Sequence, residues 1–334
     1  MYQTRDIVVI GASAGGVEAL TSIIANLDEG IQAAVFVVMH LPASHRSHLP
    51  DIFNRAGPLP AANAEDGADI EYGRIYIAPP DFHLLLSGGS MHVARGPRVN
   101  RSRPSIDLLF QSASAAMGPR VIGVVASGML DDGTRGLATI KRRGGATIVQ
   151  NPDEASFASM PLNAIAAAEI DHVLPAAEIG RALSRMAVKP LEESEMAHEA
   201  QPDDMLDASN GNGNNRRDIS TFTCPDCNGM LWEIEEGALV HYQCRVGHSF
   251  TPSALIASQV DEVEGLLWAA LRAMEEREAM YVMLEERSRI AGNVRRSTML
   301  QEKFNTNRKN AELIRQILLG EEDLVPSTDE VEFN

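Results

Sequence analysis

The sequence predicts an α/β fold with a doubly wound, mainly parallel sheet and helices on both faces. A small Cys/His β-module and C-terminal helices, either a hairpin or long separate helices, are expected to follow it. Apolar runs alternate with segments of helical period from residue 6 to about 186, which is typical of a parallel sheet covered by helices. All three cysteines lie in the last third of the chain. Beyond them, apolar positions recur at helical spacing from 252 to about 289.

Six short apolar runs are predicted to be the strands of the sheet, and helices are expected to fill most of the gaps. The runs are Ile7 to Ile10, Ala33 to Met39, Arg74 to Ala78, Val121 to Ala126, Ala146 to Val149 and His172 to Leu174. The segment from His83 to Ala94 carries a Gly-Gly pair in its middle. It is therefore expected to form a hairpin, at an antiparallel edge or as a flap.

Composition divides the chain into five predicted parts. Residues 1–187 form the α/β domain, 188–219 an acidic linker, 220–251 the Cys/His module, 252–320 a helical extension and 321–334 an acidic tail. Within the extension, a second helical stretch runs from about Val294 to Leu319. It either folds back on the first helix or pairs with another chain, and both arrangements stay open.

Charge and hydropathy exclude several classes of function. The formal net charge is −17, whereas nucleic-acid binding needs a concentrated basic face, so no nucleic-acid partner is expected. No apolar run is long enough to span a bilayer, and the N-terminus lacks the features of a secretory signal. Membrane insertion is therefore not expected, and the predicted compartment is the cytoplasm. Three clustered cysteines favour a metal site over a disulfide framework.

A turn of small residues follows the first predicted strand and carries Ser13. Gly11, Ser13 and Gly15 give G-x-S-x-G, the spacing at which a serine occupies a tight strand-to-helix turn with its oxygen exposed above the sheet. Glycine-rich turns also begin dinucleotide-binding domains, but the G-x-G-x-x-G spacing is not present here. The motif indicates a reactive serine, while a turn or helix-capping role for Ser13 stays open.

Two other predicted strand ends carry a base and two acids. His40 directly follows the second apolar run, and Asp131 and Asp132 lie in a Gly-bounded loop after the fourth. Because functional groups of parallel sheets gather at the carboxyl ends of the strands, these residues are expected to converge on the serine. Such a histidine takes the serine proton during attack on a carbonyl, and the aspartate orients the imidazole. Backbone N–H groups near Ala14 and Met129 would stabilise the oxyanion, and the choice between the two aspartates stays open.

Several separate motifs resemble, in the same order, the catalytic domain of the protein-glutamate methylesterases of bacterial chemotaxis, the CheB family. They fall within residues 4 to 186 and are Ile10-Gly-Ala-Ser-Ala-Gly-Gly16, Val38-Met-His-Leu-Pro42, Ile75-Tyr-Ile-Ala-Pro-Pro80, Arg103-Pro-Ser-Ile-Asp107, Ser127-Gly-Met-Leu-Asp-Asp-Gly133 and Met160-Pro161. The resemblance implies a serine hydrolase that demethylates glutamate γ-methyl esters on methyl-accepting chemotaxis receptors and deamidates selected glutamines. By position it implies the triad Ser13, His40 and Asp132, with Met129 beside the oxyanion region.

The same resemblance implies partners and leaves one alternative function. Family members commonly carry an N-terminal receiver domain, so the expected partners are methylated receptor helices and a separate receiver or regulatory protein. The alternative is a non-catalytic chemosensory scaffold or adaptor that binds receptor helices. No cofactor is expected for catalysis. Family members often have asparagine at the position of Asp131, and the extra carboxylate beside Asp132 is expected to alter the local titration.

The Cys/His module has the ligand spacing of one tetrahedral zinc. Cys224 and Cys227 form a C-x2-C pair, and Cys244 and His248 follow as a C-x3-H pair. Three thiolates and one imidazole would close the shell, which predicts a structural metal with no open position for water. His241 is the competing fourth ligand and is disfavoured because it lies close to Cys244 on a strand-like run. Reduced thiols without a metal stay open as an alternative.

Overall fold

The computed structural model describes residues 4–41, 47–191, 217–237 and 239–320. The chain divides into two compact units, Met1–Leu255 and Ile256–Asn334. Most of the predicted linker and all of the predicted acidic tail lie outside the described residues, so the five part boundaries stay a prediction.

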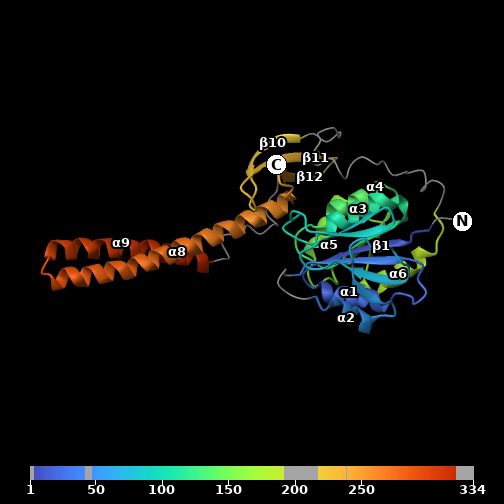
Figure 1. Ribbon diagram of the computed structural model, residues 1–334, viewed down its shortest axis with the longest axis horizontal. Helices are drawn as coiled ribbons and strands as arrows, with labels where there is room; N and C mark the ends of the chain where they lie inside the picture. Colours follow the sequence, from blue (N-terminus) through green and yellow to red (C-terminus); the bar gives the residue numbers. More distant parts are fainter. Residues whose placement is uncertain (1–3, 42–46, 192–216, 238, 321–334) are drawn as a thin grey trace. The chain divides into compact units, whose positions relative to one another are not determined.

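A seven-stranded parallel sheet lies at the centre of the first unit (Figure 1). Its order is β3-β4-β2-β1-β7-β8-β9, made from β1 (Ile7–Ala12), β2 (Ala34–Met39), β3 (Ala61–Asn63), β4 (Arg74–Ile77), β7 (Val121–Val125), β8 (Ala146–Gln150) and β9 (His172–Leu174). The predicted fold class and its six strands are confirmed, with ends shifted by a residue or two. The sequence analysis missed β3, an edge strand of Ala, Ala and Asn without β-branched or aromatic side chains.

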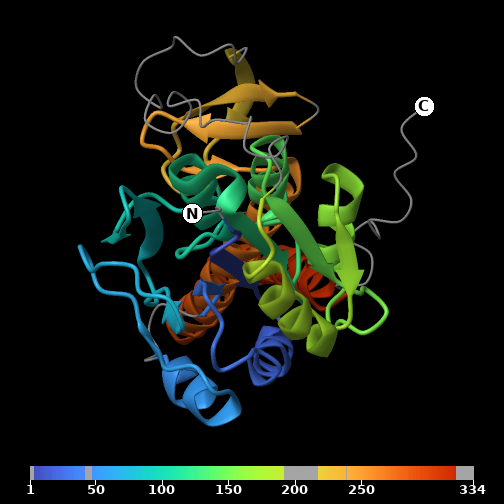
Figure 2. The same ribbon diagram turned by 90° about the vertical axis from the view of Figure 1, so that its right-hand side faces the viewer.

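Helices cover both faces of the sheet (Figures 1 and 2). One face carries α1 (Gly16–Ala25), α2 (Leu49–Ala56) and α6 (Ala176–Ala187), and the other carries α3 (Ile106–Met117), α4 (Thr134–Arg142) and α5 (Ser159–Ala167). The short 3-10 helix η1 (Gly118–Arg120) precedes β7. Side chains of each strand alternate between the two cores, as Val8 and Val9 do. Burial on both faces explains why the strands read as continuous apolar runs.

The predicted hairpin is present but does not extend the large sheet. Strands β5 (His83–Ser87) and β6 (Ser90–Ala94) pair around Gly88 and Gly89, which have φ values of 57° and 89°. They form a separate two-stranded sheet. Its Leu84, Leu86 and Met91 pack into the core beside α3, so the hairpin is anchored by burial rather than by strand pairing.

The Cys/His module forms a second, four-stranded antiparallel sheet in the same unit. Its strands β10 (Arg217–Thr223), β11 (Met230–Glu236), β12 (Leu239–Cys244) and β13 (Ser249–Phe250) pair in chain order. A small core of Leu231, Phe250 and Leu255 lies against Cys224 and Cys244. Few apolar side chains hold this module together, and a metal ion would add what its core lacks.

The helical extension folds back on itself. Helix α8 spans Pro252–Ile290 and α9 spans Val294–Leu319. In the second unit, Leu271 packs with Ala311 and Leu318, and the side chain of Asn307 donates to the Met274 carbonyl at 2.8 Å. Of the two arrangements left open by the sequence, the structure contains the hairpin. None of the helices in the described part of the chain combines the length and apolarity that a membrane span requires.

Candidate active site

Ser13 lies in the turn between β1 and α1, at the carboxyl end of the central strand. Its N–H donates to the Ser127 carbonyl at 2.9 Å. A Cβ on Gly11 would lie 2.2 Å from a methyl carbon of Ile106, and Gly15 has a φ of 67°. Residues other than glycine rarely adopt that backbone conformation. The two glycines therefore let β1 approach α3 and let the chain turn sharply after the serine.

His40 follows β2 and links the serine to an acid. Its Nδ1 lies 3.3 Å from the Ser13 Oγ, and its Nε2 lies 2.9 Å from the Asp132 Oδ2. The His40 side chain is 17% exposed and the Asp132 side chain 3%, so the imidazole faces solvent while the carboxylate does not. With the proton on Nε2, the ring donates to Asp132 and accepts from Ser13. The structure thus brings the three residues together, and their catalytic role stays a prediction.

The two adjacent aspartates have different partners. Asp132 Oδ2 accepts a hydrogen bond from the His40 Nε2, whereas Asp131 Oδ1 accepts one from the Thr251 hydroxyl at 2.7 Å. Burial, with a smaller contribution from the charge of Asp132, raises the pKa of Asp131. The residue spacing left this choice open, and the geometry assigns the contact with His40 to Asp132.

Several further donors hold the Asp132 carboxylate, and the sequence analysis identified none of them in this role. They are the Asn100 Nδ2 at 3.1 Å, the Ser105 Oγ at 3.1 Å, and the N–H groups of Ile106 at 2.8 Å, Asp107 at 3.2 Å and Gly133 at 3.1 Å. Most come from the first turn of α3 and the loop before it. The motif Arg103-Pro-Ser-Ile-Asp107 was the available signal, because it contains three of these residues.

Asp107 is a second buried carboxyl beside Asp132. It accepts from the Asn100 Nδ2 at 2.8 Å and from the Gly136 N–H at 2.7 Å. Burial and the charge of Asp132 raise the pKa of Asp107 to about 8. Burial acts in the same direction on Asp132, but the hydrogen bond and charge of His40 outweigh it, so the pKa of Asp132 lies below its ordinary value. At neutral pH the pair therefore carries one negative charge, on the carboxylate that contacts His40.

The raised pKa of Asp107 predicts a pH dependence of stability. The folded protein keeps this proton up to about pH 8, whereas the unfolded chain releases it near the ordinary value of 3.8. The proton on Asp107 stabilises the folded protein fully when the pH lies below the pKa of the unfolded chain. This contribution is lost as the pH rises through the pKa of the folded protein. Between about pH 6.5 and 8 we expect the free energy of unfolding of the wild type to fall by at most about 1.4 kcal/mol per pH unit relative to Asp107→Asn.

Urea unfolding of both proteins across that range measures this difference. Asp171→Asn is the matched control, because the pKa of Asp171 is lowered: the bonds from Lys141 and Thr147 outweigh its partial burial. Asp171 is ionised well below this pH range. The free energy of unfolding of Asp171→Asn should therefore change with pH as steeply as that of the wild type. Equal slopes for wild type and Asp107→Asn would show that Asp107 is already ionised at neutral pH.

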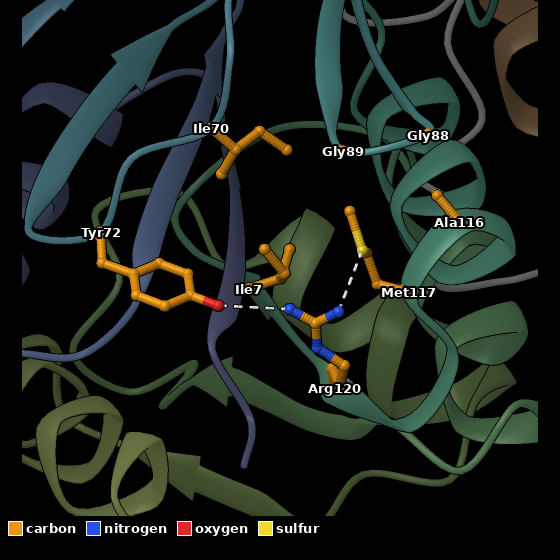
Figure 3. A pocket seen from close by; sticks show the side chains of 8 residues that line it. All are labelled: Ile7, Ile70, Tyr72, Gly88, Gly89, Ala116, Met117 and Arg120. Carbon is orange, nitrogen blue, oxygen red and sulfur yellow. Dashed lines mark hydrogen bonds between the residues drawn. The ribbon is translucent and has the colours of Figure 1, made fainter. Parts of the chain in front are cut away.

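One cavity lies away from Ser13, and it is larger than another one beside His40. It measures about 440 Å³ and is bounded by Ile7, at the start of β1, and by Arg120, just before β7 (Figure 3). This is the amino end of the parallel strands. Its polar groups bind one another, because Arg120 and Tyr72 both contact the Asp6 carboxylate at 2.6 to 2.8 Å. Such mutual pairing is a structural arrangement and leaves these groups little capacity for a ligand.

The smaller cavity lies on His40. It measures about 210 Å³, and its other lining residues are Leu41, Asp81, Arg98, Arg101, Ser102, Arg103 and Pro104. The Ser102 hydroxyl lies 3.4 Å from the same His40 Nδ1 that faces Ser13. The sequence analysis did not identify Ser102.

Two N–H groups are expected at the oxyanion, and one of them belongs to Ala14, the residue after Ser13. Within the described residues, no acceptor takes a hydrogen bond from the N–H of Ala14 or Met129. Gly128 approaches the serine so closely that an added Cβ would lie 3.0 Å from the Ser13 Cβ. The loop that carries Met129 therefore borders the hydroxyl, and its part in oxyanion binding stays a prediction.

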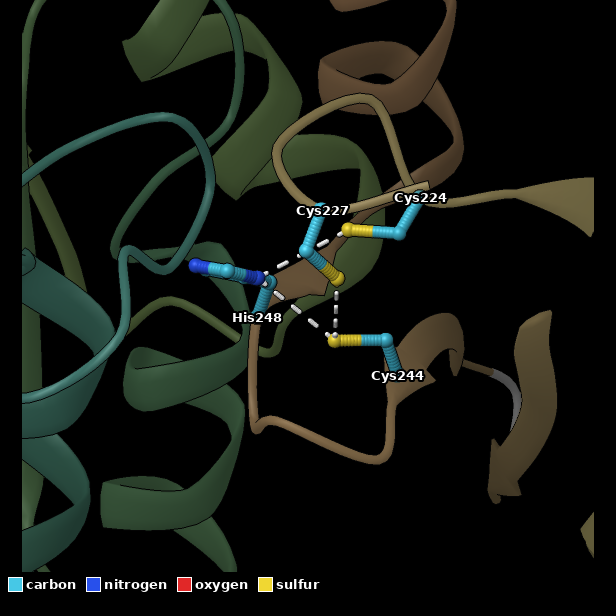
Figure 4. A group of neighbouring side chains, drawn as sticks. All are labelled: Cys224, Cys227, Cys244 and His248. Atoms are coloured by element: carbon cyan, nitrogen blue, oxygen red, sulfur yellow. Dashed lines mark hydrogen bonds between the residues drawn. The ribbon is translucent and has the colours of Figure 1, made fainter. Parts of the chain in front are cut away.

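The four predicted metal ligands are brought together in the Cys/His module (Figure 4). Their ligand atoms all lie within 4.8 Å of one another. Cys244 Sγ lies 3.5 Å from the His248 Nδ1 and 3.6 Å from the Cys227 Sγ, and Cys224 Sγ lies 3.7 Å from the His248 Nδ1. A tetrahedral zinc ion would separate such ligand atoms by roughly 3.5 to 3.8 Å, given Zn–S and Zn–N distances of about 2.3 and 2.0 Å. The cluster can therefore hold a metal ion, and His241 is not part of it.

Comparisons with known proteins agree with the fold and identify the family. The sequence model of CheB methylesterases matches residues 8–183. A protein of Leptospira interrogans is 36% identical over 187 residues, which cover 56% of this chain and 97% of that protein, and its name provisionally assigns it as a protein-glutamate methylesterase/protein-glutamine glutaminase. Protein-glutamate methylesterase/protein-glutamine glutaminase 5 of Anaeromyxobacter dehalogenans is 39% identical over 190 residues, covering 56% of this chain and 52% of its own.

A solved structure also matches part of this chain. The catalytic domain of the Thermotoga maritima CheB methylesterase superposes with a TM-score of 0.52 at 32% sequence identity, over 55% of this chain and 99% of that one. The family model, which matches residues 8–183, ends before the Cys/His module. The matched sequence, the shared sheet and the convergence of Ser13, His40 and Asp132 agree: this chain belongs to the CheB methylesterase family.

Proposed function

We propose that this protein is a serine hydrolase that demethylates glutamate γ-methyl esters on chemotaxis receptors and deamidates selected glutamines at the same site. The observation that carries the proposal is the hydrogen-bonded chain from Ser13 through His40 to the buried Asp132. The names of the similar proteins support both the ester and the amide substrate. Both are carbonyl compounds, and both suit the same nucleophile.

In the proposed reaction, the Ser13 Oγ attacks the carbonyl carbon of the methyl ester while the His40 Nδ1 takes the hydroxyl proton. Asp132 stabilises the imidazolium through Nε2, and the N–H groups of Ala14 and Met129 bind the oxyanion. The His40 Nδ1 then returns the proton to the methoxy oxygen, so methanol leaves and Ser13 keeps the acyl group. A water molecule repeats the sequence and releases a glutamate carboxylate and the free serine. From glutamine, the first leaving group is ammonia.

Incubation with receptor membranes whose glutamate esters carry labelled methyl groups tests the function directly. We expect labelled methanol to be released, and pretreatment with a fluorophosphonate, which phosphonylates activated serines with loss of fluoride, should stop the release. Conversion of receptor glutamine to glutamate is measured in parallel by mass spectrometry. A purified, folded protein that releases neither methanol nor ammonia would contradict the enzyme and favour the scaffold alternative.

Arg98, Arg101 and Arg103 line the small cavity beside His40, and this basic rim suits an acidic receptor helix. Arg98 is exposed and lines the small cavity, although the whole chain has a net charge of −17. Unmodified glutamates of such a helix are negatively charged, so Arg98 would attract it. We expect Arg98→Glu to raise KM for an acidic methylated peptide roughly 3- to 10-fold with little change in kcat, and the effect to shrink at high salt.

Steady-state kinetics at low and high ionic strength measure this effect. Arg185→Glu makes the same change of charge on an exposed position of α6 and should leave KM unchanged. Equal changes in KM for the two variants would mean that net charge, rather than the rim, governs the encounter.

We also propose that Cys224, Cys227, Cys244 and His248 hold one structural zinc ion. The second ring nitrogen of His248 lies 4.0 Å from the Asp226 carboxylate, so an opposite charge is near but no direct hydrogen bond orients the ring. Four protein ligands leave no position for water, so the metal would stabilise the module rather than take part in ester hydrolysis. No other cofactor is proposed for catalysis.

A further inference from the structure

The loop between β6 and α3 lies between the active site and the Cys/His module. Asn100 in this loop is 6% exposed, although asparagine is mostly found at protein surfaces. Asn100 and Arg101 both have left-handed backbone, with φ values of 49° and 67°. Asparagine adopts this backbone more readily than most residues. The contacts of the buried Asn100 side chain then help to hold the loop in place.

On the side of the active site, the Asn100 amide contacts both buried carboxyls. Its Nδ2 donates to the Asp132 Oδ1 at 3.1 Å and to the Asp107 Oδ2 at 2.8 Å. The other oxygen of Asp132, Oδ2, accepts the hydrogen bond from the His40 Nε2. Asn100 can therefore fix the plane of the carboxylate without competing with the imidazole.

On the opposite side, the module holds Asn100 through β13 and the residue that follows it. The Asn100 N–H donates to the Ser249 carbonyl at 2.8 Å, and the Asn100 Oδ1 accepts from the Thr251 N–H at 3.0 Å. The Ser249 N–H donates to the Arg98 carbonyl at 3.3 Å. These contacts begin one residue after His248, a ligand of the proposed metal.

We propose that Asn100 is a positioning residue for Asp132 and that the metal-bound Cys/His module holds Asn100 where this role requires it. The proposal rests on the proposed hydrolase function and on the proposed metal site. A metal ion that fixes His248 also fixes the start of β13, and thereby Ser249 and Thr251. Loss of the metal would release both contacts with Asn100, and Asp132 would lose a donor that orients it.

The first test compares Asn100→Ala with the wild type. We expect kcat for the methyl ester to fall about 10- to 100-fold, the range found when an outer partner of a metal ligand is lost. KM should stay unchanged because Asn100 does not line the cavity beside His40. The rate at which a fluorophosphonate labels Ser13 should fall by the same factor. Asn54→Ala is the matched control, because it removes two side-chain hydrogen bonds to Ala61, at the start of β3, and should change neither rate.

The second test removes zinc from the full-length protein with a chelator. Labelling of Ser13 in the wild type should fall about as far as it does in Asn100→Ala, and adding zinc back should restore it. Asn100→Ala should lose nothing further on zinc removal, because the connection is already broken. Amide exchange of the Asn100 N–H should become faster in the zinc-free wild type, since its acceptor on Ser249 is released.

Each outcome decides one question. Unchanged labelling in Asn100→Ala, or equal losses on zinc removal with and without Asn100, would overturn the positioning role. If Asn100→Ala does not fold, zinc removal from the wild type decides alone, and unchanged labelling overturns the proposal. Labelling needs no methyl ester, so a protein that is labelled as expected but releases no methanol would contradict the proposed function and not the positioning role.

Discussion

Ser13→Ala is expected to lower kcat for methyl ester hydrolysis by about 10⁴- to 10⁶-fold. The substitution removes the nucleophile, so no acyl group can form on the chain, and the histidine and aspartate alone cannot replace it. Fluorophosphonate labelling should disappear together with methanol release. The free energy of unfolding should change little, because the turn keeps both glycines and the bond from the Ser13 N–H to the Ser127 carbonyl.

Ser90→Ala is the matched control for that variant. It removes a hydroxyl of β6 that bonds the Ser87 carbonyl at 3.1 Å, at the turn of the hairpin. Its kcat and its labelling should equal those of the wild type. If Ser13→Ala released methanol at the wild-type rate, another group would perform the attack, and the proposed mechanism would be wrong.

Loss of the metal is expected to unfold the Cys/His module while the parallel sheet stays folded. Structural zinc contributes apparent binding free energies of about 10 to 16 kcal/mol in small zinc-finger peptides, far more than a core of Leu231, Phe250 and Leu255 can replace. Hydrogen exchange should become fast in β10 to β12 and stay slow in β1 and β7. Elemental analysis should find one zinc per chain in the wild type and a clear loss in Cys244→Ser.

The two histidines of the module provide the control. His248→Gln should lose the metal, because the His248 Nδ1 lies 3.5 to 3.7 Å from two cysteine sulfurs. His241→Gln should keep it, since His241 is outside the ligand group. The reverse pattern would assign the fourth ligand to His241, and a folded, metal-free wild type would remove the zinc site altogether.

The parallel sheet was predictable because its chemistry is local. Strands buried on both faces, such as Ala34–Met39, read as apolar runs wherever they lie in the chain. The edge strand Ala61–Asn63 was not predictable, since a neighbour rather than its own side chains holds it in the sheet. Helix α9 left two packing arrangements open for a similar reason. Its apolar stripe shows that the helix must be covered, but it does not show whether α8 or another chain covers it.

The active site divides in the same way. Ser13 and His40 were predictable from their places at strand ends. The choice of Asp132 over Asp131 was not, because two neighbouring residues share one loop and only the direction of each side chain separates them. Asn100 and Thr251 could not be found from local sequence either, since their hydrogen bond joins segments 151 residues apart.

That separation also sets an order of events during synthesis. A ribosome adds about 5 to 20 residues per second, so Asn100 is made roughly 8 to 30 s before Thr251. Ser13 and His40 are already made before Asn100, and Asp132 is added during that interval, when the central strands can begin to pair. The asparagine amide between the two buried carboxyls still lacks its second anchor. Translation itself therefore delays the second anchor of Asn100 until the Cys/His module has left the ribosome.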